Sequence, residues 1–182
     1  MSALRVLVVL SLAVLSGCLV TFKDPIPANE AAPLTLLGQW QRVDEWGEPE
    51  TLEVSRSGSN VYLARLQSRD ENGGVILQTL SFTVSHHGRR WYLCAGVPKA
   101  EGGHFALGGF ELVGEDVLVL HQLDAKAIGE DVARNRLAGE TVTLFGHEGV
   151  LVTAELEQVF TYLDDPANAD LFSEMARYRR VK

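Results

Sequence analysis

Residues 75–97, VILQTLSFTVSHHGRRWYLCAGV, contain the clearest strand pattern of the chain. Between positions 79 and 85, apolar residues at even positions alternate with Thr and Ser at odd positions. This period of two is typical of a strand with one buried and one exposed face. His87-Gly88 then leads into a second apolar run. The stretch predicts two antiparallel strands, 75–86 and 90–97, joined by a tight turn.

Similar runs on either side extend this pattern into a sheet. Asn72-Gly73 precedes the stretch, and Asn-Gly tolerates the positive φ angles that tight hairpin turns require. Gly114-Glu115-Asp116 provides another turn further along the chain. Because each strand pairs most simply with its sequence neighbour, we expect an antiparallel meander of seven strands. Their predicted bounds are 36–43, 51–56, 60–69, 75–86, 90–97, 104–113 and 117–123.

The pattern changes after this meander. Asp124 can cap a helix over 124–137, where apolar residues recur near helical spacing. Two short apolar runs, 141–145 and 150–152, then predict one more pair of strands.

Two further helices are predicted towards the C-terminus. Thr153 is a suitable N-cap for a helix through Leu163, with apolar residues at i, i+3, i+4 and i+7. Asp165-Pro166 opens the second helix, since proline fits the first helical turn. Its predicted buried face is Leu171, Phe172 and Met175, and residues 178–181 follow as a short strand or an extended tail. The predicted fold class is therefore α+β, mainly β with C-terminal helices.

Composition is that of an ordinary globular chain, and it limits the possible partners. The 182 residues are 46% apolar and 22% charged, with a formal net charge of −8. Basic residues occur in no run longer than the pairs Arg89-Arg90 and Arg179-Arg180. Nucleic-acid binding needs a dense basic surface, so we expect no nucleic-acid partner.

The first 18 residues, MSALRVLVVLSLAVLSGC, have the features of a secretion signal. Arg5 precedes the stretch 6–15, which is apolar except for Ser11 and too short to span a membrane. The following Leu15-Ser16-Gly17-Cys18 resembles the lipobox of bacterial lipoprotein precursors. That resemblance implies removal of a signal peptide, residues 1–17, and acylation of Cys18, with palmitate as a typical acyl group. Two or more acyl chains make a stable membrane anchor.

The residues after Cys18 suggest where the anchored protein lies. Leu19 follows the cysteine, whereas aspartate at this position is the inner-membrane retention pattern of enteric bacteria. Because Leu19 stands in place of that aspartate, the lipoprotein resemblance implies the periplasmic face of the outer membrane. Three prolines within 18–33 discourage regular structure, so this segment is predicted to be a flexible tether. Residues 34–182 then form a single globular β-rich domain.

Gly38-x-Trp40, at the start of the meander, resembles the first-strand motif of the lipocalin/calycin group. In that group the tryptophan plugs one end of a small barrel, so the resemblance implies a calycin-like barrel or half-barrel. An open curved sheet with helices on one face is the alternative. The chain also resembles small uncharacterised bacterial lipoproteins with a first-strand Leu-x-Gly-x-Trp and a closing Leu-Phe and Tyr-x-Arg-Val, which here occupy 36–40, 171–172 and 178–181. That second likeness implies no activity.

The chain has no residue pattern that predicts catalysis, a metal site or a cofactor. Its histidines lack the short spacing of common zinc sites, although His104 and His121 lie on neighbouring predicted strands. A Gly-x-Ser-x-Gly nucleophile elbow does not occur. Cys94 lies in an apolar run and is interpreted as a small buried hydrophobe. We therefore expect no enzymatic activity.

Aromatic residues in the predicted strands carry the one specific ligand hypothesis. Trp40, Trp91, Tyr62 and Phe82 either belong to the core or line a cavity for a small apolar ligand. The lipid anchor and the lack of catalytic spacing favour a non-enzymatic interaction or structural module that meets another envelope protein. The alternative is a calycin-like binder of a small apolar ligand. A packed interior favours the first hypothesis, and Trp40 or Trp91 facing an open cavity favours the second.

Overall fold

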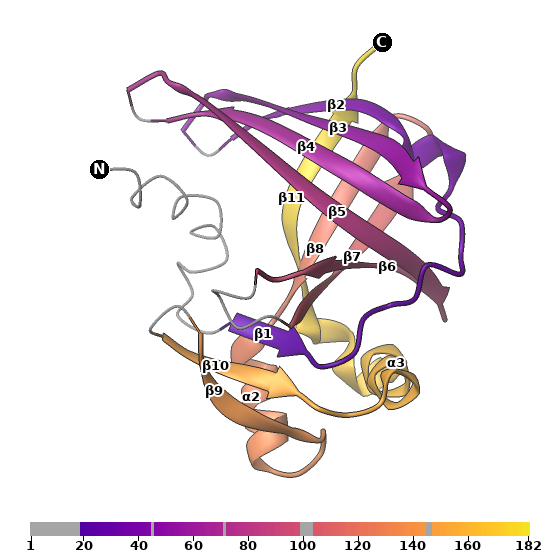
Figure 1. The fold of residues 1–182 in the computed structure, drawn as a ribbon, viewed down its shortest axis with the longest axis vertical. Helices are drawn as coiled ribbons and strands as arrows, with labels where there is room; N and C mark the ends of the chain where they lie inside the picture. The colour runs from indigo at the N-terminus through magenta and orange to yellow at the C-terminus, as the bar shows by residue number, and fades with distance from the viewer. Residues whose placement is uncertain (1–18, 45, 71, 99–103, 145–146) are drawn as a thin grey trace.

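Eight strands form a closed antiparallel barrel, which is the largest part of the molecule (Figure 1). The computed structural model describes residues 19–44, 46–70, 72–98, 104–144 and 147–182. The barrel strands are β2 (Gly38–Val43), β3 (Pro49–Gly58), β4 (Val61–Arg69), β5 (Val75–His87), β6 (Arg90–Gly96), β7 (Phe105–Val113), β8 (Val117–Leu123) and β11 (Phe172–Arg180).

The strands β2 to β8 form the predicted meander, in which each strand pairs with the next one along the chain. The hairpin of the opening stretch is confirmed, with Phe82 opposite Ala95 and His87 opposite Arg90. β11 then pairs with β8 on one side and with β2 on the other, which closes the sheet. The small calycin-like barrel is therefore confirmed, and the open curved sheet is wrong.

The closing strand occupies residues for which the sequence predicts a second helix. Only Pro166–Leu171 are helical, as the 3-10 helix η3. Of the predicted buried face, Leu171 is buried and Phe172 packs partly buried against the core, whereas Met175 lies exposed at a bulge between Glu174 and Ala176. A barrel with seven strands in sequence needs one more strand between the last and the first, and the alternation of residues along β11 fits that place.

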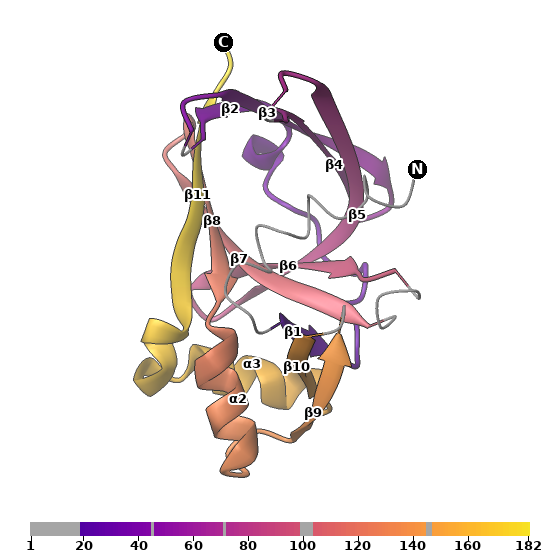
Figure 2. The same ribbon diagram turned by 90° about the vertical axis from the view of Figure 1, so that its left-hand side faces the viewer.

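A second layer packs against the outside of the barrel (Figure 2). Its strands are β1 (Leu19–Phe22), β9 (Gly139–Leu144) and β10 (His147–Val152), where β10 pairs parallel with β1 and antiparallel with β9. The pairing of β9 with β10 confirms the predicted pair of short strands. The apolar run of β6 serves both sides, since Tyr92 and Cys94 face the second layer while Leu93 and Ala95 face the barrel interior.

Two helices complete the second layer, α2 (Ala125–Ala133) and α3 (Leu156–Asp164). Asp124 caps α2 as predicted, and its Oδ1 accepts a hydrogen bond of 2.9 Å from the Ala127 amide. The predicted cap of α3 is wrong, because Glu155 and not Thr153 occupies the N-cap position. The backbone amide of Thr153 instead donates to Ala138 O, which continues the sheet contact of β10 by one residue.

The described part of the predicted tether, residues 19–33, is folded. Phe22 and Ile26 are 2% and 1% exposed within the second-layer core. Residues 23–37, which we call the N-terminal strap, then pass to the barrel, where Ala32 packs in the interior. Proline excludes helix but allows an extended segment, and the apolar residues between the prolines bury against both cores. The prediction of a flexible tether is therefore wrong for residues 19–33. Cys18 and the predicted signal peptide lie outside the described residues.

Candidate functional site

The strap seals one end of the barrel. The Ala32 amide donates to the Tyr62 hydroxyl at 2.8 Å, and the Thr83 hydroxyl donates to Ile26 O at 2.6 Å. Asn60, in the turn between β3 and β4, donates to Ala28 O. Figure 1 shows the strap on the right-hand side, between β1 and the start of β2. We call this end of the barrel the sealed end.

Trp40 plugs the sealed end from inside, as the calycin resemblance implies. Its side chain is 0% exposed, and its Nε1 donates to Leu36 O at 3.0 Å. The Arg180 guanidinium lies 4.1 Å from the centre of the indole ring and donates to Leu37 O and Glu115 O. Gly38 is required beside them, because its φ is +124° and a Cβ there would lie 2.8 Å from Arg180 Nη1.

The structure brings all four predicted aromatic residues into the barrel interior. Trp40, Tyr62 and Phe82 are buried, and the Tyr62 and Phe82 ring centres are 5.6 Å apart. Trp91 is only half-buried and packs between His86 and Phe110, with ring centres 4.8 Å and 5.7 Å away. Three of the four therefore act as core residues, and Trp91 alone keeps exposed surface.

A buried charged network, which the sequence did not indicate, lies inside the barrel near the turn between β2 and β3. Glu50 is 3% exposed, and its Oε1 accepts from Arg42 Nε and from the Tyr178 hydroxyl, each at 2.5 Å. Burial, and then the hydrogen bond to Glu50, raise the pKa of Tyr178 above its ordinary value. Because Glu50 neutralises Arg42, this network is better suited to holding strands together than to binding a charged ligand.

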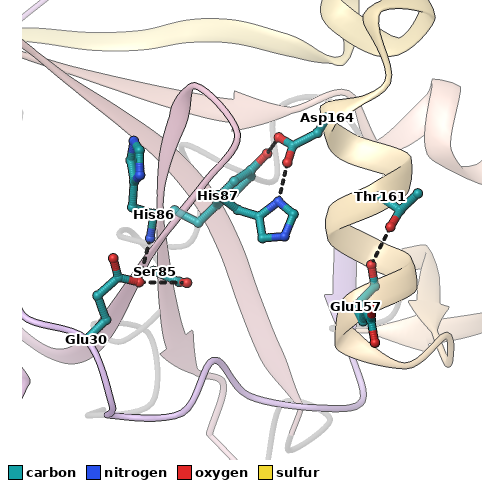
Figure 3. Close-up of polar contacts among 8 residues, drawn as sticks. Glu30, Ser85, His86, His87, Glu157, Thr161 and Asp164 are labelled. Carbon is teal, nitrogen blue, oxygen red and sulfur yellow. Dashed lines mark hydrogen bonds and ion pairs between the residues drawn. The ribbon is translucent and has the colours of Figure 1, made fainter.

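A second polar cluster joins α3 to the turn between β5 and β6 (Figure 3). One oxygen of the Asp164 carboxylate pairs with His87 Nδ1, and the other accepts from the Tyr92 hydroxyl at 2.7 Å. The His87 ring also stacks on Phe160 at 4.8 Å. Gly88 allows this approach, since its φ is +58° and a Cβ would lie 2.8 Å from Asp164 Oδ2.

The chemistry of this cluster is that of a clamp. An aspartate–histidine pair can orient an imidazole for catalysis when a hydroxyl or thiol lies next to the ring. The nearby Ser85 hydroxyl instead donates to Glu30 at 3.0 Å, and the same carboxylate accepts from the His86 amide at 2.8 Å. Both pairs fasten an outer segment, α3 or the strap, to the end of β5.

Cys94 and the histidines have structural surroundings. Cys94 is buried as predicted, and burial raises the pKa of its thiol above the ordinary value. His121 lies opposite Gly109 in the β7–β8 pairing, and its Nε2 is 4.0 Å from Glu111; the pairing does not include His104. Among the residues that the structure describes, no group of three or more His, Cys, Asp or Glu side chains could hold a metal ion.

The end of the barrel opposite the strap carries exposed apolar side chains. Val43, Trp46, Val75 and Leu77, which we call the apolar rim, are 61–71% exposed and lie at the turns between β2 and β3 and between β4 and β5. They are four of the eight exposed large apolar side chains in the described part of the chain, and Leu80, further along β5, is a fifth. Exposed apolar residues gathered in one place mark an interaction surface, so the rim is the candidate functional site.

Comparisons with protein-family models, with curated proteins and with solved structures found no match for this chain. Within the described residues, no helix has the length and apolar character needed to cross a membrane.

Proposed function

We propose that this chain is a lipid-anchored envelope protein without enzymatic activity, whose barrel is an interaction module. The lipid is carried by Cys18, and the barrel meets other envelope components through its outer surface. The observation that carries this proposal is the contrast between a packed interior, with Trp40 and Leu118 at 0% exposure, and the exposed apolar rim. Side chains that could bind an apolar partner are on the outside.

The anchor is tested by intact mass spectrometry of the protein extracted from membranes. We expect a chain that begins at Cys18, 182 − 17 = 165 residues long, with the added mass of two or three acyl groups. A Cys18→Ser variant should keep residues 1–17 and lack the acyl mass. An uncleaved wild-type chain with a free Cys18 thiol would refute the anchor.

A small apolar ligand is a second candidate function, and Leu80 favours it. This side chain lies on the same face of β5 as the inward-facing Phe82 and Val84, yet it is 46% exposed. An inward-facing leucine that stays accessible offers an apolar contact near the rim. Native mass spectrometry of the protein from its own host tests this, since a bound molecule adds mass that is lost on denaturation. A chain that carries only its own acyl groups would exclude this candidate.

A further inference from the structure

We propose that the apolar rim rests on the lipid bilayer that holds the anchor, so that the end of the barrel that carries the rim faces the membrane. This inference depends on the proposed acylation of Cys18. It goes further because it gives the barrel a fixed orientation and assigns the exposed residues Val43, Trp46, Val75 and Leu77 a lipid partner.

The proposed acylation site lies directly before the folded part of the chain in the sequence. Cys18 immediately precedes β1, and Leu19–Phe22 pair along their whole length with residues 149–152 of β10. Val20, Thr21 and Phe22 are buried, so β1 cannot be pulled free without loss of core contacts. One residue spans at most about 3.6 Å, so no backbone spacer would separate the acylated residue from β1.

The rim and the start of β1 lie on the same side of the molecule. Figure 1 shows the start of β1 and the turns between β2 and β3 and between β4 and β5 on the same, left-hand side of the molecule, and Figure 2 views it from that side. The strap lies on the opposite side of the barrel in Figure 1. A membrane that receives acyl chains at the start of β1 therefore faces the end of the barrel that carries the rim.

The side chains of the rim are of the kinds that suit a membrane interface. Tryptophan and aliphatic side chains at the tips of turns suit the boundary between headgroups and acyl chains, where an indole can bury its ring and keep its N–H hydrated. Trp46 is 71% exposed and Leu77 is 65% exposed, and both would lose this surface to lipid. Among the described residues, the part of β5 that contains Leu77, residues 75–81, pairs with β4 alone.

Two of the acidic residues in these turns, Asp44 and Asp70, make local hydrogen bonds. Asp44 Oδ1 accepts from the amides of Trp46 and Glu48, and Asp70 Oδ1 accepts from the amides of Asn72 and Gly74. These carboxylates shape their own turns. The net charge of −8 nevertheless disfavours an anionic surface, so the expected partner is a zwitterionic bilayer.

The test places an environment-sensitive probe on the rim of the full acylated protein. Leu77→Cys is labelled with nitrobenzoxadiazole and the protein is reconstituted into phosphatidylcholine vesicles. Leu34→Cys is the matched control, because Leu34 is 82% exposed and belongs to the strap at the sealed end. Both positions are exposed, so both variants should fold, and buried Cys94 should stay unlabelled.

We expect a blue-shifted emission at position 77 that brominated phosphatidylcholine quenches, and an unshifted, unquenched emission at position 34. Equal responses at the two positions would overturn the proposal. So would a response at position 77 that appears only at high protein-to-lipid ratio, which would indicate contact between copies or with another protein. The acyl mass separates the two failures: if it is present and position 77 stays in water, the membrane contact is wrong and the anchor stands. If it is absent, both are wrong.

Discussion

The two ends of the barrel differ in the chemistry of the side chains that they bury and expose. At the sealed end, the interior is closed by Trp40, with Arg180 stacked on it and the strap across the opening. At the other end, the ion pair of Arg42 and Glu50 lies buried just inside exposed apolar turns. One end thus buries its largest aromatic residue, and the other buries charge and exposes a tryptophan.

This difference separates residues that maintain the fold from exposed residues that can contact a binding partner. Side chains at the sealed end contact several elements each, so changes there should lower stability. Rim side chains are exposed, so their replacement should leave stability unchanged and alter only binding. Paired substitutions at buried and exposed positions test this separation.

The largest effect is expected for Trp40→Ala. Removing a fully buried tryptophan loses its burial free energy and leaves a cavity, which lowers the free energy of unfolding by about 3–5 kcal/mol. Trp46→Ala is the matched control, since the same change at a 71% exposed position should alter stability by less than about 0.5 kcal/mol. Urea unfolding followed by circular dichroism measures both. Similar losses for the two variants would contradict the separation of the ends.

The buried ion pair should give the next largest effect. Glu50→Gln removes the charge that Arg42 and Tyr178 both bind, and we expect a loss of about 2–3 kcal/mol, typical of hydrogen bonds to a buried charged group. Glu53→Gln, on an outward-facing position of β3 three residues further along, is the control and should change stability by less than about 0.5 kcal/mol. An unchanged unfolding midpoint for Glu50→Gln would mean that the pair contributes nothing to stability at this end.

The same network predicts a pH dependence in alkaline solution. Burial and Glu50 raise the pKa of Tyr178, so the unfolded chain releases this proton at a lower pH than the folded chain does. Stability is therefore lost as pH rises above the ordinary tyrosine pKa, by up to about 1.4 kcal/mol per pH unit for one proton. Tyr178→Phe should show a shallower fall between pH 10 and 11. Equal slopes for the two proteins would contradict the raised pKa.

The comparison also explains what the sequence could predict. The strands β2 to β8 were accessible because each has alternating residues and pairs with its neighbour, so local pattern and turn residues suffice. Trp40 was accessible through its Gly-x-Trp context. β11 was not, because Leu171 and Phe172 begin an apolar pattern that also fits a helix, and only the open gap between β8 and β2 selects the strand.

The polar contacts were inaccessible for a related reason. Glu50 and Tyr178 are 128 residues apart, and His87 and Asp164 are 77 apart, so no local spacing identifies them as partners. The rim was missed because exposure depends on how far a hairpin extends beyond its neighbours, which no local residue pattern records. Four aromatic residues were correctly placed together, but a sequence does not say whether such a cluster is packed or hollow.

The smallest effect tests residues 23–33 of the strap, which the sequence predicts to be part of a flexible tether. Ile26→Val removes one methylene group from a side chain that is 1% exposed, and we expect a loss of about 1 kcal/mol. Leu34→Val removes the same group from an 82% exposed side chain of the same strap and should have no measurable effect. A flexible tether would give no change for either variant, because neither side chain would have a packed environment to lose. A loss confined to Ile26→Val therefore requires that the strap folds with the two cores, and it makes the sealed end part of the cooperative structure.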